Sequence, residues 1–421
     1  MSDLILPVRS VAELTAEASM SLDDTTLAAT QAILEDVRVG GDDALRRRIT
    51  QFEDRPAETL LFGREALESA YGRLDPAVQG LLARTAERIG LFARGQMASL
   101  HAFEMPIPGG VAGHQIAPVE RAACYAPGGR FPLPSSVLMT AVTARAAGVK
   151  TVLVVSPSTD DVMLGAAFVA GADQFLWAGG AHAIGAVAYG TETIPAVDMV
   201  VGPGNRWVTA AKHLVSGRVG IDMLAGPSEL VVAADGAADP AVIAADLLAQ
   251  AEHDPDARPI VVTSDPALVA PINAALETQL ATLSTADIAR AALQNGGIVL
   301  CDDTTAVVAA VNALAPEHLE LLGPTIEPLA EVIQHYGGLF VGAGAAEVLG
   351  DYGAGPNHVL PTGGTARFSG GLSVFDFVRI RTWMRIDAPA DAQGLVADAE
   401  ALADLEGLVG HARSAAQRRA G

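Results

Sequence analysis

Cysteine, aromatic residues, positive charge and long apolar runs are all scarce in this 421-residue chain. The two cysteines, Cys124 and Cys301, form neither a C-x-x-C motif nor a disulfide framework, which is typical of a protein in a reducing cytoplasm. No uninterrupted apolar run of about 18 residues is present, so we expect no membrane span. The first residues, MSDLILPVRS, lack the basic region and apolar stretch of a secretory signal. We therefore expect a cytoplasmic protein.

The charge of the chain is strongly unbalanced. Only 27 Lys and Arg residues oppose 49 Asp and Glu residues, for a formal net charge of −22. Phosphate binding needs clusters of basic residues, so this balance argues against a nucleic-acid partner. Half of the residues are hydrophobic, which is enough for large packed cores, and the length favours two or three domains.

The pattern of apolar residues changes along the chain. The first hundred residues carry apolar side chains at helical spacing, with Ser21 and Asp23 as plausible caps. From about residue 118, short runs such as TVLVVSP and PIVVTSD alternate with helical stretches. Such runs are typical of parallel strands that helices bury on both faces. We therefore predict an α/β protein with one or two open parallel sheets, a helical N-terminal region and a helical C-terminal tail.

Three glycine-rich loops follow predicted strands, at residues 125–136, 201–207 and 361–372. Ligands of open α/β sheets lie beyond the carboxyl ends of the strands, and glycines there let backbone N–H groups approach a phosphate or a substrate. None of the loops is a G-x-G-x-x-G fingerprint, and the chain has no Walker A sequence. Ordinary tight turns would explain each loop equally well.

Several polar residues could carry chemistry. Gln250 and His253 are three residues apart at the end of a predicted helix, a spacing at which two side chains can chelate a metal such as Zn²⁺. Glu317 and His318 stand side by side after Pro316, where a short apolar strand begins. Two further pairs complete the inventory, in a glycine-rich segment and in the alanine-rich tail: Asp351 with His358, and Glu406 with His411. From spacing alone, the sequence indicates an α/β enzyme that could use a metal.

Seven motifs, in this order, resemble the histidinol dehydrogenase family from about residue 30 to the C-terminus: YAPGG, SSVLM, GPGN, AGPSE, QAEH, PEHLE and GPNHVLPT. The resemblance implies a zinc-dependent, NAD-linked homodimer. Each subunit would have two incomplete Rossmann-like, open parallel-sheet domains and a tail that crosses to the partner subunit. It also implies an organisation into an N-terminal helical segment (1–20), a discontinuous main α/β domain (21–124 and 229–372), an inserted NAD-binding domain (125–228) and a helical dimerisation tail (373–421).

The resemblance further implies roles for individual residues. The zinc ligands would be Gln250, His253, Asp351 and His411. The substrate would contact these four residues together with Ser228, His318, His358 and Glu406. The NAD site would lie near Tyr125, His182 and Asn205.

For Glu317 and His318, the family implies roles in the oxidation of an alcohol through an aldehyde to a carboxylate, with two NAD⁺ and one water. His318 would remove the hydroxyl proton in the first step, and Glu317 would activate the water in the second step. Zn²⁺ would mainly orient the substrate. These expectations apply to L-histidinol as the substrate and L-histidine as the product.

Some residues depart from the biosynthetic pattern. His182 stands where the family usually has glutamine, which affects the preference between NAD and NADP. Arg130, Arg367 and His114 suit an anionic group and resemble a paralogous branch, the sulfopropanediol 3-dehydrogenases, although solvent-facing loop charge would explain them too. The alternative function is therefore oxidation of another amino- or sulfo-alcohol, such as 2,3-dihydroxypropane-1-sulfonate. A chain that has lost activity is a third reading, but every expected ligand and both proton-transfer residues are present.

Overall fold

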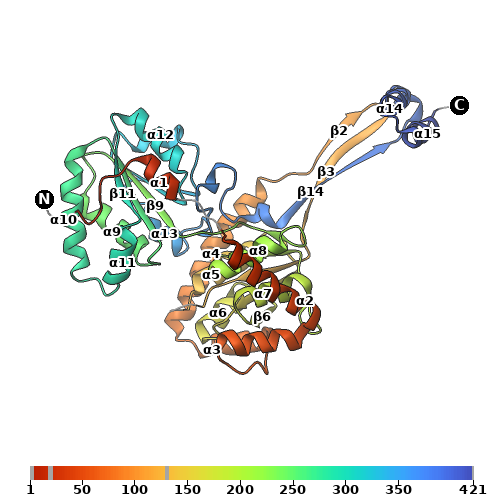
Figure 1. Ribbon diagram of the computed structural model, residues 1–421. Coiled ribbons are helices and arrows are strands. Elements are labelled where there is room, and N and C mark those ends of the chain that lie inside the picture. Colours follow the sequence, from red (N-terminus) through yellow and green to blue (C-terminus); the bar gives the residue numbers. More distant parts are fainter. Residues whose placement is uncertain (1–3, 18–21, 129–131, 420–421) are drawn as a thin grey trace.

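The computed structural model describes residues 4–17, 22–128 and 132–419, which form two α/β parts and a projecting arm (Figure 1). The helices of the two α/β parts are α1 (Val11–Glu17), α2 (Asp24–Glu53), α3 (Arg64–Arg73), α4 (Pro76–Ala98), α5 (Pro134–Ala146), α6 (Asp161–Val169), α7 (Gly180–Tyr189), α8 (Arg206–Val215), α9 (Pro240–Ala251), α10 (Val269–Leu280), α11 (Ala286–Leu293), α12 (Thr304–Leu314) and α13 (Glu347–Asp351). Short 3-10 helices lie at Pro266–Leu268, Glu327–Glu331, Thr365–Arg367, Val374–Phe377 and Pro389–Ala392.

The first sheet has the strand order β1-β6-β5-β4-β7-β8, and all its neighbours are parallel except the antiparallel pair of β1 and β6. Its strands are β1 (Leu61–Gly63), β4 (Arg121–Tyr125), β5 (Thr151–Ser156), β6 (Gln174–Trp177), β7 (Met199–Val201) and β8 (Gly220–Ile221). One core lies between this sheet and α3 to α6, and a second lies between the sheet and α2, α7 and α8. Burial on both faces explains why these strands read as unbroken apolar runs.

The second sheet is entirely parallel, in the order β11-β10-β9-β12-β13. Its strands are β9 (Glu229–Ala234), β10 (Arg258–Thr263), β11 (Gly297–Leu300), β12 (His318–Leu322) and β13 (Gly338–Val341). Helices α9 to α11 cover one face, and α1 and α12 cover the other. When the parallel strands of each sheet are numbered along the chain, their spatial order in both sheets is 3-2-1-4-5. This is the Rossmann strand order without the sixth strand. The predicted fold class is confirmed.

The packing divides the chain differently from the predicted domains. Helices α2 to α4 and strand β1, all within residues 21–124, pack on the first sheet rather than on the sheet formed by 229–341. Strand β4 belongs to that first sheet too, while Leu6 and Leu14 of the N-terminal segment are buried against the second sheet. Helical periodicity shows that a helix has an apolar face, but it does not show which sheet covers that face.

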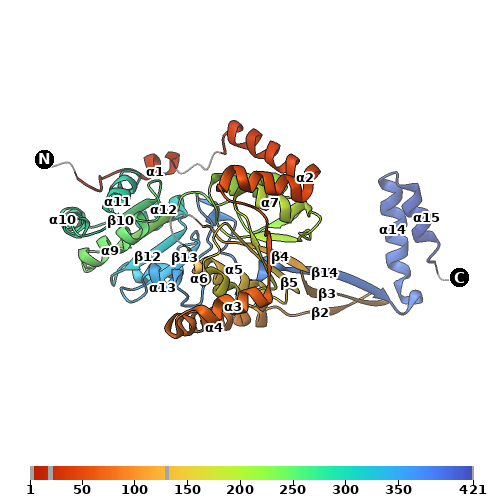
Figure 2. The same cartoon turned by 90° about the horizontal axis from the view of Figure 1, so that it is seen from below.

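The arm consists of a three-stranded antiparallel sheet and two helices. Its elements are β2 (Phe103–Ile107), β3 (Gly110–Pro118), β14 (Val378–Ile386), α14 (Gln393–Leu405) and α15 (Val409–Ala416). The predicted tail, 373–421, therefore begins with a 3-10 turn and the strand β14, and its α-helices follow only after that strand. Figure 2 shows α14 and α15 standing clear of both α/β parts, at the far end of the hairpin.

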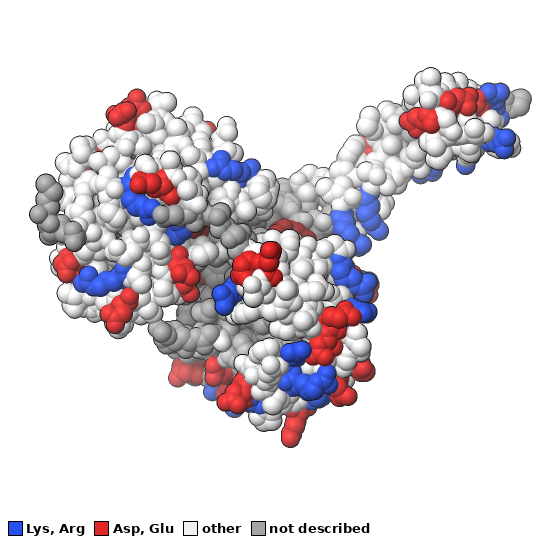
Figure 3. All heavy atoms as spheres, in the orientation of Figure 1, with Lys and Arg blue, Asp and Glu red and all other residues white. Residues whose placement is uncertain are grey.

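The surface carries both charge signs. In the face drawn in Figure 3, Lys and Arg side chains are interspersed with Asp and Glu, and no continuous basic surface is visible. Among the described helices, not one combines the length and the apolar character that a membrane crossing requires.

Candidate active site

Glu317 and His318 reach the head of β12 through a sharp turn. Helix α12 ends at Leu314, and Ala315 takes a left-handed conformation with φ of 47° while its N–H donates to the carbonyl of Val311. Pro316 then directs the chain into the strand, which begins at His318 as the sequence predicts. The proton-transfer pair therefore lies at the amino end of a parallel strand. This is the end of the strand opposite to the carboxyl end, where ligands of open α/β sheets bind.

The imidazole of His318 is held by the neighbouring strand. Its Nδ1 lies 3.1 Å from the carbonyl oxygen of Glu229, and because a carbonyl can only accept, Nδ1 carries the hydrogen. The buried Nε2 has no hydrogen-bond partner among the described residues and lies 3.9 Å from Oδ1 of Asp351. Burial lowers the pKa of His318 to about 3, and the neighbouring His253 and His358 favour the same direction. His318 is thus a neutral base with a free nitrogen.

Glu317 is buried beside this imidazole. Its Oε2 accepts a hydrogen bond of 2.9 Å from the backbone N–H of Glu229 and lies 3.7 Å from Nδ1 of His318. Burial, together with the charges of Glu229 and Asp351, raises the pKa of Glu317 well above its usual value. A carboxylate with a raised pKa is a stronger base, which suits the activation of a water molecule.

Asp351 and His358 complete this group. Asp351 is the last residue of α13, and its carbonyl oxygen lies 3.0 Å from Nδ1 of His358. Burial raises the pKa of Asp351, and it lowers the pKa of His358 to about 4. The structure therefore brings Glu317, His318, Asp351 and His358 together from two segments of the chain.

The same place offers ligands for a cation. One ligand atom from each of His318, Glu347 and Asp351 lies within 4.8 Å of the other two. Gln250 of α9 is completely buried, yet neither its amide oxygen nor its amide nitrogen has a hydrogen-bond partner in the described structure. A buried amide with no partner needs one, and imidazole, carboxylate and amide groups suit Zn²⁺. The donor set thus fits a zinc ion.

His253 lies just beyond the end of α9 and is exposed. Its charge acts on the pKa of both His318 and Asp351, which places the imidazole close to this group. Ser228 directly precedes β9 and is half-buried, and its carbonyl accepts from the backbone N–H of Arg258 at 2.9 Å.

Sequence reasoning missed Glu229 and Glu347. Glu229 contacts both catalytic candidates through its backbone, and its Oε1 lies 2.8 Å from Nη1 of Arg258. Glu347 is buried, and its Oε1 lies 3.7 Å from Nδ1 of His318. The spacing of Glu347 one helical turn before Asp351 was the signal that could have found it, because such residues share a helix face.

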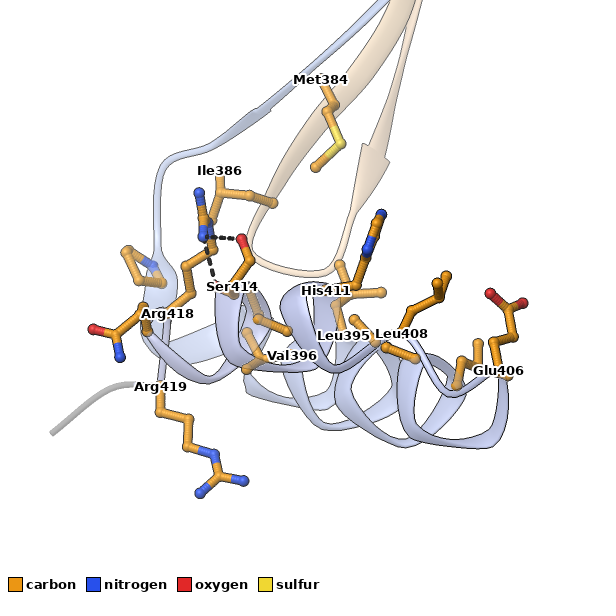
Figure 4. Close-up of a pocket in the computed structure, with 17 residues that line it drawn as sticks. Met384, Ile386, Leu395, Val396, Glu406, Leu408, His411, Ser414, Arg418 and Arg419 are labelled. Carbon is orange, nitrogen blue, oxygen red and sulfur yellow. Dashed lines mark hydrogen bonds between the residues drawn. The ribbon is translucent and has the colours of Figure 1, made fainter.

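Glu406 and His411 are not brought to this group within one chain. Both are exposed on the arm, at a hollow between strand β14 and helices α14 and α15 (Figure 4). Apolar residues line the same hollow, among them Met384, Leu395, Leu402 and Leu408.

The predicted cofactor residues cluster at the carboxyl ends of the first sheet. The hydroxyl oxygen of Tyr125 accepts a hydrogen bond of 3.1 Å from the N–H of Gly180 at the start of α7. Asn205 caps α8, with its Oδ1 accepting from the N–H groups of Trp207 and Val208. Between them, Gly202 has φ of 111°, and a Cβ there would lie 2.0 Å from the carbonyl oxygen of Tyr125. Only glycine allows this approach of the loop to the strand.

His182 is buried in α7. Its Nε2 lies 2.9 Å from Oε1 of Glu53, which also accepts from the N–H of Gly179, and its ring stacks on Phe52 with centroids 5.7 Å apart. Its Nδ1 is buried and has no hydrogen-bond partner among the described residues.

The described residues of the suggested anion site do not come together. Arg367 donates to the carbonyl of Ala313, whereas His114 lies on β3 of the arm with its Nε2 2.9 Å from the carbonyl of His101. Arg130 lies outside the described residues.

Comparison with known proteins matches nearly the whole chain. The family model for histidinol dehydrogenase matches residues 17–419. The chain is 46% identical over 405 residues to a histidinol dehydrogenase of Thermus thermophilus, covering 96% of this chain and 97% of the relative. It is 42% identical to one of Acinetobacter baylyi, covering 94% of each chain.

A crystal structure of histidinol dehydrogenase from Elizabethkingia anophelis is similar with a TM-score of 0.92 and 30% identity over 99% of both chains. The chain belongs to the histidinol dehydrogenase family. It is thus an oxidoreductase, and the resemblance seen in the motifs is confirmed.

Proposed function

We propose that the protein oxidises L-histidinol through L-histidinal to L-histidine, with zinc bound and NAD⁺ as the oxidant. The observation that carries this proposal is the convergence of Glu317, His318 and Asp351 in a chain that the family model matches almost from end to end. Relatives of this chain bear the name histidinol dehydrogenase.

Gln250, His253 and Asp351 would hold the zinc ion, with His411 of the partner subunit as a fourth ligand. The unpaired amide of Gln250 and the grouping around Asp351 support the first part of this assignment. When bound, zinc would orient the substrate through its imidazole and amino nitrogens. Ser228, His358 and the partner subunit's Glu406 would complete the substrate contacts.

Exposed apolar residues on the arm and beside the site support a shared active site in a homodimer. Leu405, at 84% exposure, and Val409, at 55%, flank Glu406 and His411. Leu349, at 53%, and Tyr352, at 66%, flank Asp351 on α13. Because large apolar side chains gain free energy when they are buried, the arm of one subunit would cover α13 of the other. This contact would bring His411 of the partner subunit to Asp351.

The first chemical step is the oxidation of the alcohol. Nε2 of His318 is free and its pKa is low, so it can accept the hydroxyl proton at neutral pH. A hydride leaves the same carbon for NAD⁺, and the aldehyde, NADH and one proton result. A base at this position contributes a factor of about 10²–10⁴ to the rate.

In the second step, water adds to the aldehyde. Glu317 takes a proton from the water while the water oxygen attacks the carbonyl carbon of the aldehyde. A second hydride then leaves this carbon for a second NAD⁺. The product is the carboxylate. The raised pKa of Glu317 makes it the stronger base of the two residues.

NAD⁺ would bind at the carboxyl ends of the first sheet, near Tyr125, His182 and Asn205. The close approach of the Gly202 loop to Tyr125 supports this position, since dinucleotides bind where glycine lets the backbone come near.

The test is NADH formation by the zinc-loaded protein with L-histidinol and 2,3-dihydroxypropane-1-sulfonate offered in parallel. Two NADH for each histidinol, with histidine as the product, is the expected result, and chelation of zinc should abolish it. Activity on the sulfonate alone would instead favour the paralogous function. Zinc binding with no turnover of either compound would contradict both substrates.

A further inference from the structure

Glu320 is a completely buried carboxyl group that the proposed mechanism does not use. It lies on β12 two residues after His318, so both side chains point to the same face of the strand. Burying a carboxyl group costs free energy, and an apolar residue of similar size would pack at least as stably. A role other than stability would explain its presence here.

The carboxyl group of Glu320 interacts with residues of two helices, α13 and α9. Oε1 accepts a hydrogen bond of 2.8 Å from the backbone N–H of Glu347, which is the first residue of α13. Oε2 has no hydrogen-bond partner among the described groups, and the Glu320 carboxyl group also interacts with the side chain of Asp246 on α9. Burial and the Asp246 charge raise the pKa of Glu320, which is consistent with one proton shared by the pair.

Asp246 and Glu347, the two residues that interact with Glu320, each lie one helical turn from a residue of the proposed site. On α9, Asp246 lies one helical turn before Gln250. On α13, Glu347 lies one turn before Asp351. A displacement of either helix against β12 would therefore move a proposed zinc ligand relative to His318.

We propose that Glu320 is a positioning residue that holds α9 and α13 against β12, so that Gln250, His318 and Asp351 converge on one point. The part of this inference that concerns zinc rests on the proposed function. The part that concerns α13 rests only on the hydrogen bond between Glu320 and Glu347.

The variants Glu320→Ala and Glu320→Gln test this role. Alanine removes both contacts, whereas glutamine keeps an acceptor for the Glu347 N–H and supplies an amide donor to Asp246. Asp235→Ala is the matched control: Asp235 is also buried, it accepts from the N–H and hydroxyl of Thr325, and it follows β9 at the opposite end of the same sheet.

Two measurements are made on each full-length protein. In zinc titrations against a chromophoric chelator, Glu320→Ala should weaken binding by about 10- to 100-fold, as is typical when a residue that supports metal ligands is lost. In hydrogen exchange of apo protein, peptides that contain α13 should exchange at least about 10-fold faster. Glu320→Gln should restore both values, and Asp235→Ala should change neither.

Hydrogen exchange separates the inference from the proposed function, because it needs no metal. If wild-type protein binds no zinc, the proposed function fails, while faster exchange of α13 in Glu320→Ala alone would still support the positioning role. Unchanged exchange of α13 in Glu320→Ala, or equal changes in Asp235→Ala, would overturn it. Failure of Glu320→Gln to restore either value would overturn it as well.

Discussion

Nε2 of His318 lies 3.9 Å from Oδ1 of Asp351, and no protein group donates to this nitrogen among the described residues. One residue opens a strand and the other closes a short helix, so only the packing of α13 against β12 brings them together. The proposed base and a proposed zinc ligand are thus neighbours, which would place a zinc-held alcohol within reach of the imidazole. The predictions below test this arrangement.

Replacing Glu317 by Gln should separate the two oxidations. Glutamine keeps the acceptor for the Glu229 N–H but cannot take a proton from water. We expect oxidation of L-histidinal to slow by about 10²–10⁴-fold and oxidation of L-histidinol to the aldehyde to slow far less. Single-turnover NADH formation from each compound measures this, and an equal loss in both would contradict the division of roles.

The two oxidations should also differ in their pH dependence. Glu317 must be ionised to accept a proton, and because burial raises its pKa, aldehyde oxidation should fall as the pH drops through that raised value. His318 stays neutral down to a pH near its pKa of about 3, so alcohol oxidation should persist to lower pH. Rates between pH 5 and 9 for each substrate check this. Coincident acidic limbs would show that one group controls both steps.

Mixed dimers test the shared active site. His411→Ala and Glu317→Gln should each form almost no histidine, but a hybrid dimer would combine an intact body from one chain with an intact arm from the other. Random reassociation should then restore about a quarter of the wild-type sites, because half of the dimers are hybrids with one intact site each. No recovery after reassociation, verified by separate affinity tags, would show that each site is made by one chain.

The buried pair of Lys212 and Asp222 should stabilise the first α/β part. Lys212 also donates to the carbonyl of Gly202 at 2.9 Å, and Oδ2 of Asp222 accepts from the Gly202 N–H at 2.7 Å. Lys212→Met leaves Asp222 buried and unpaired, so it should lower the free energy of unfolding by about 3 kcal/mol.

The matched control for this pair is the double variant Lys212→Met with Asp222→Asn, which carries no buried charge. It should recover about 1 kcal/mol or more in urea unfolding, because removal of the charge removes most of the penalty. If single and double variants were equally unstable, the unpaired charge would not be the cause.

The sequence by itself determined the α/β class, most strands of both sheets and the place of Glu317 and His318 at the start of β12. These features are local: buried parallel strands read as apolar runs, and the turn at Ala315 and Pro316 is short. The strands of the arm were missed because they lack such an apolar run. Since β2 and β14 are largely exposed, neither is an unbroken apolar run, although β14 begins with alternating apolar and basic residues, Val-Arg-Ile-Arg.

Only the tertiary structure decided which sheet covers each helix, that the candidate site residues lie at the amino ends of the second sheet, and that Glu229, Glu320 and Glu347 lie near them. These facts depend on contacts between segments far apart in the chain, and periodicity shows that a face is apolar without naming its partner. A buried carboxyl group such as Glu320 looks like a surface residue in the sequence. Packing against α9 and α13 gives it its contacts, because burial and hydrogen-bond partners exist only after the elements have assembled.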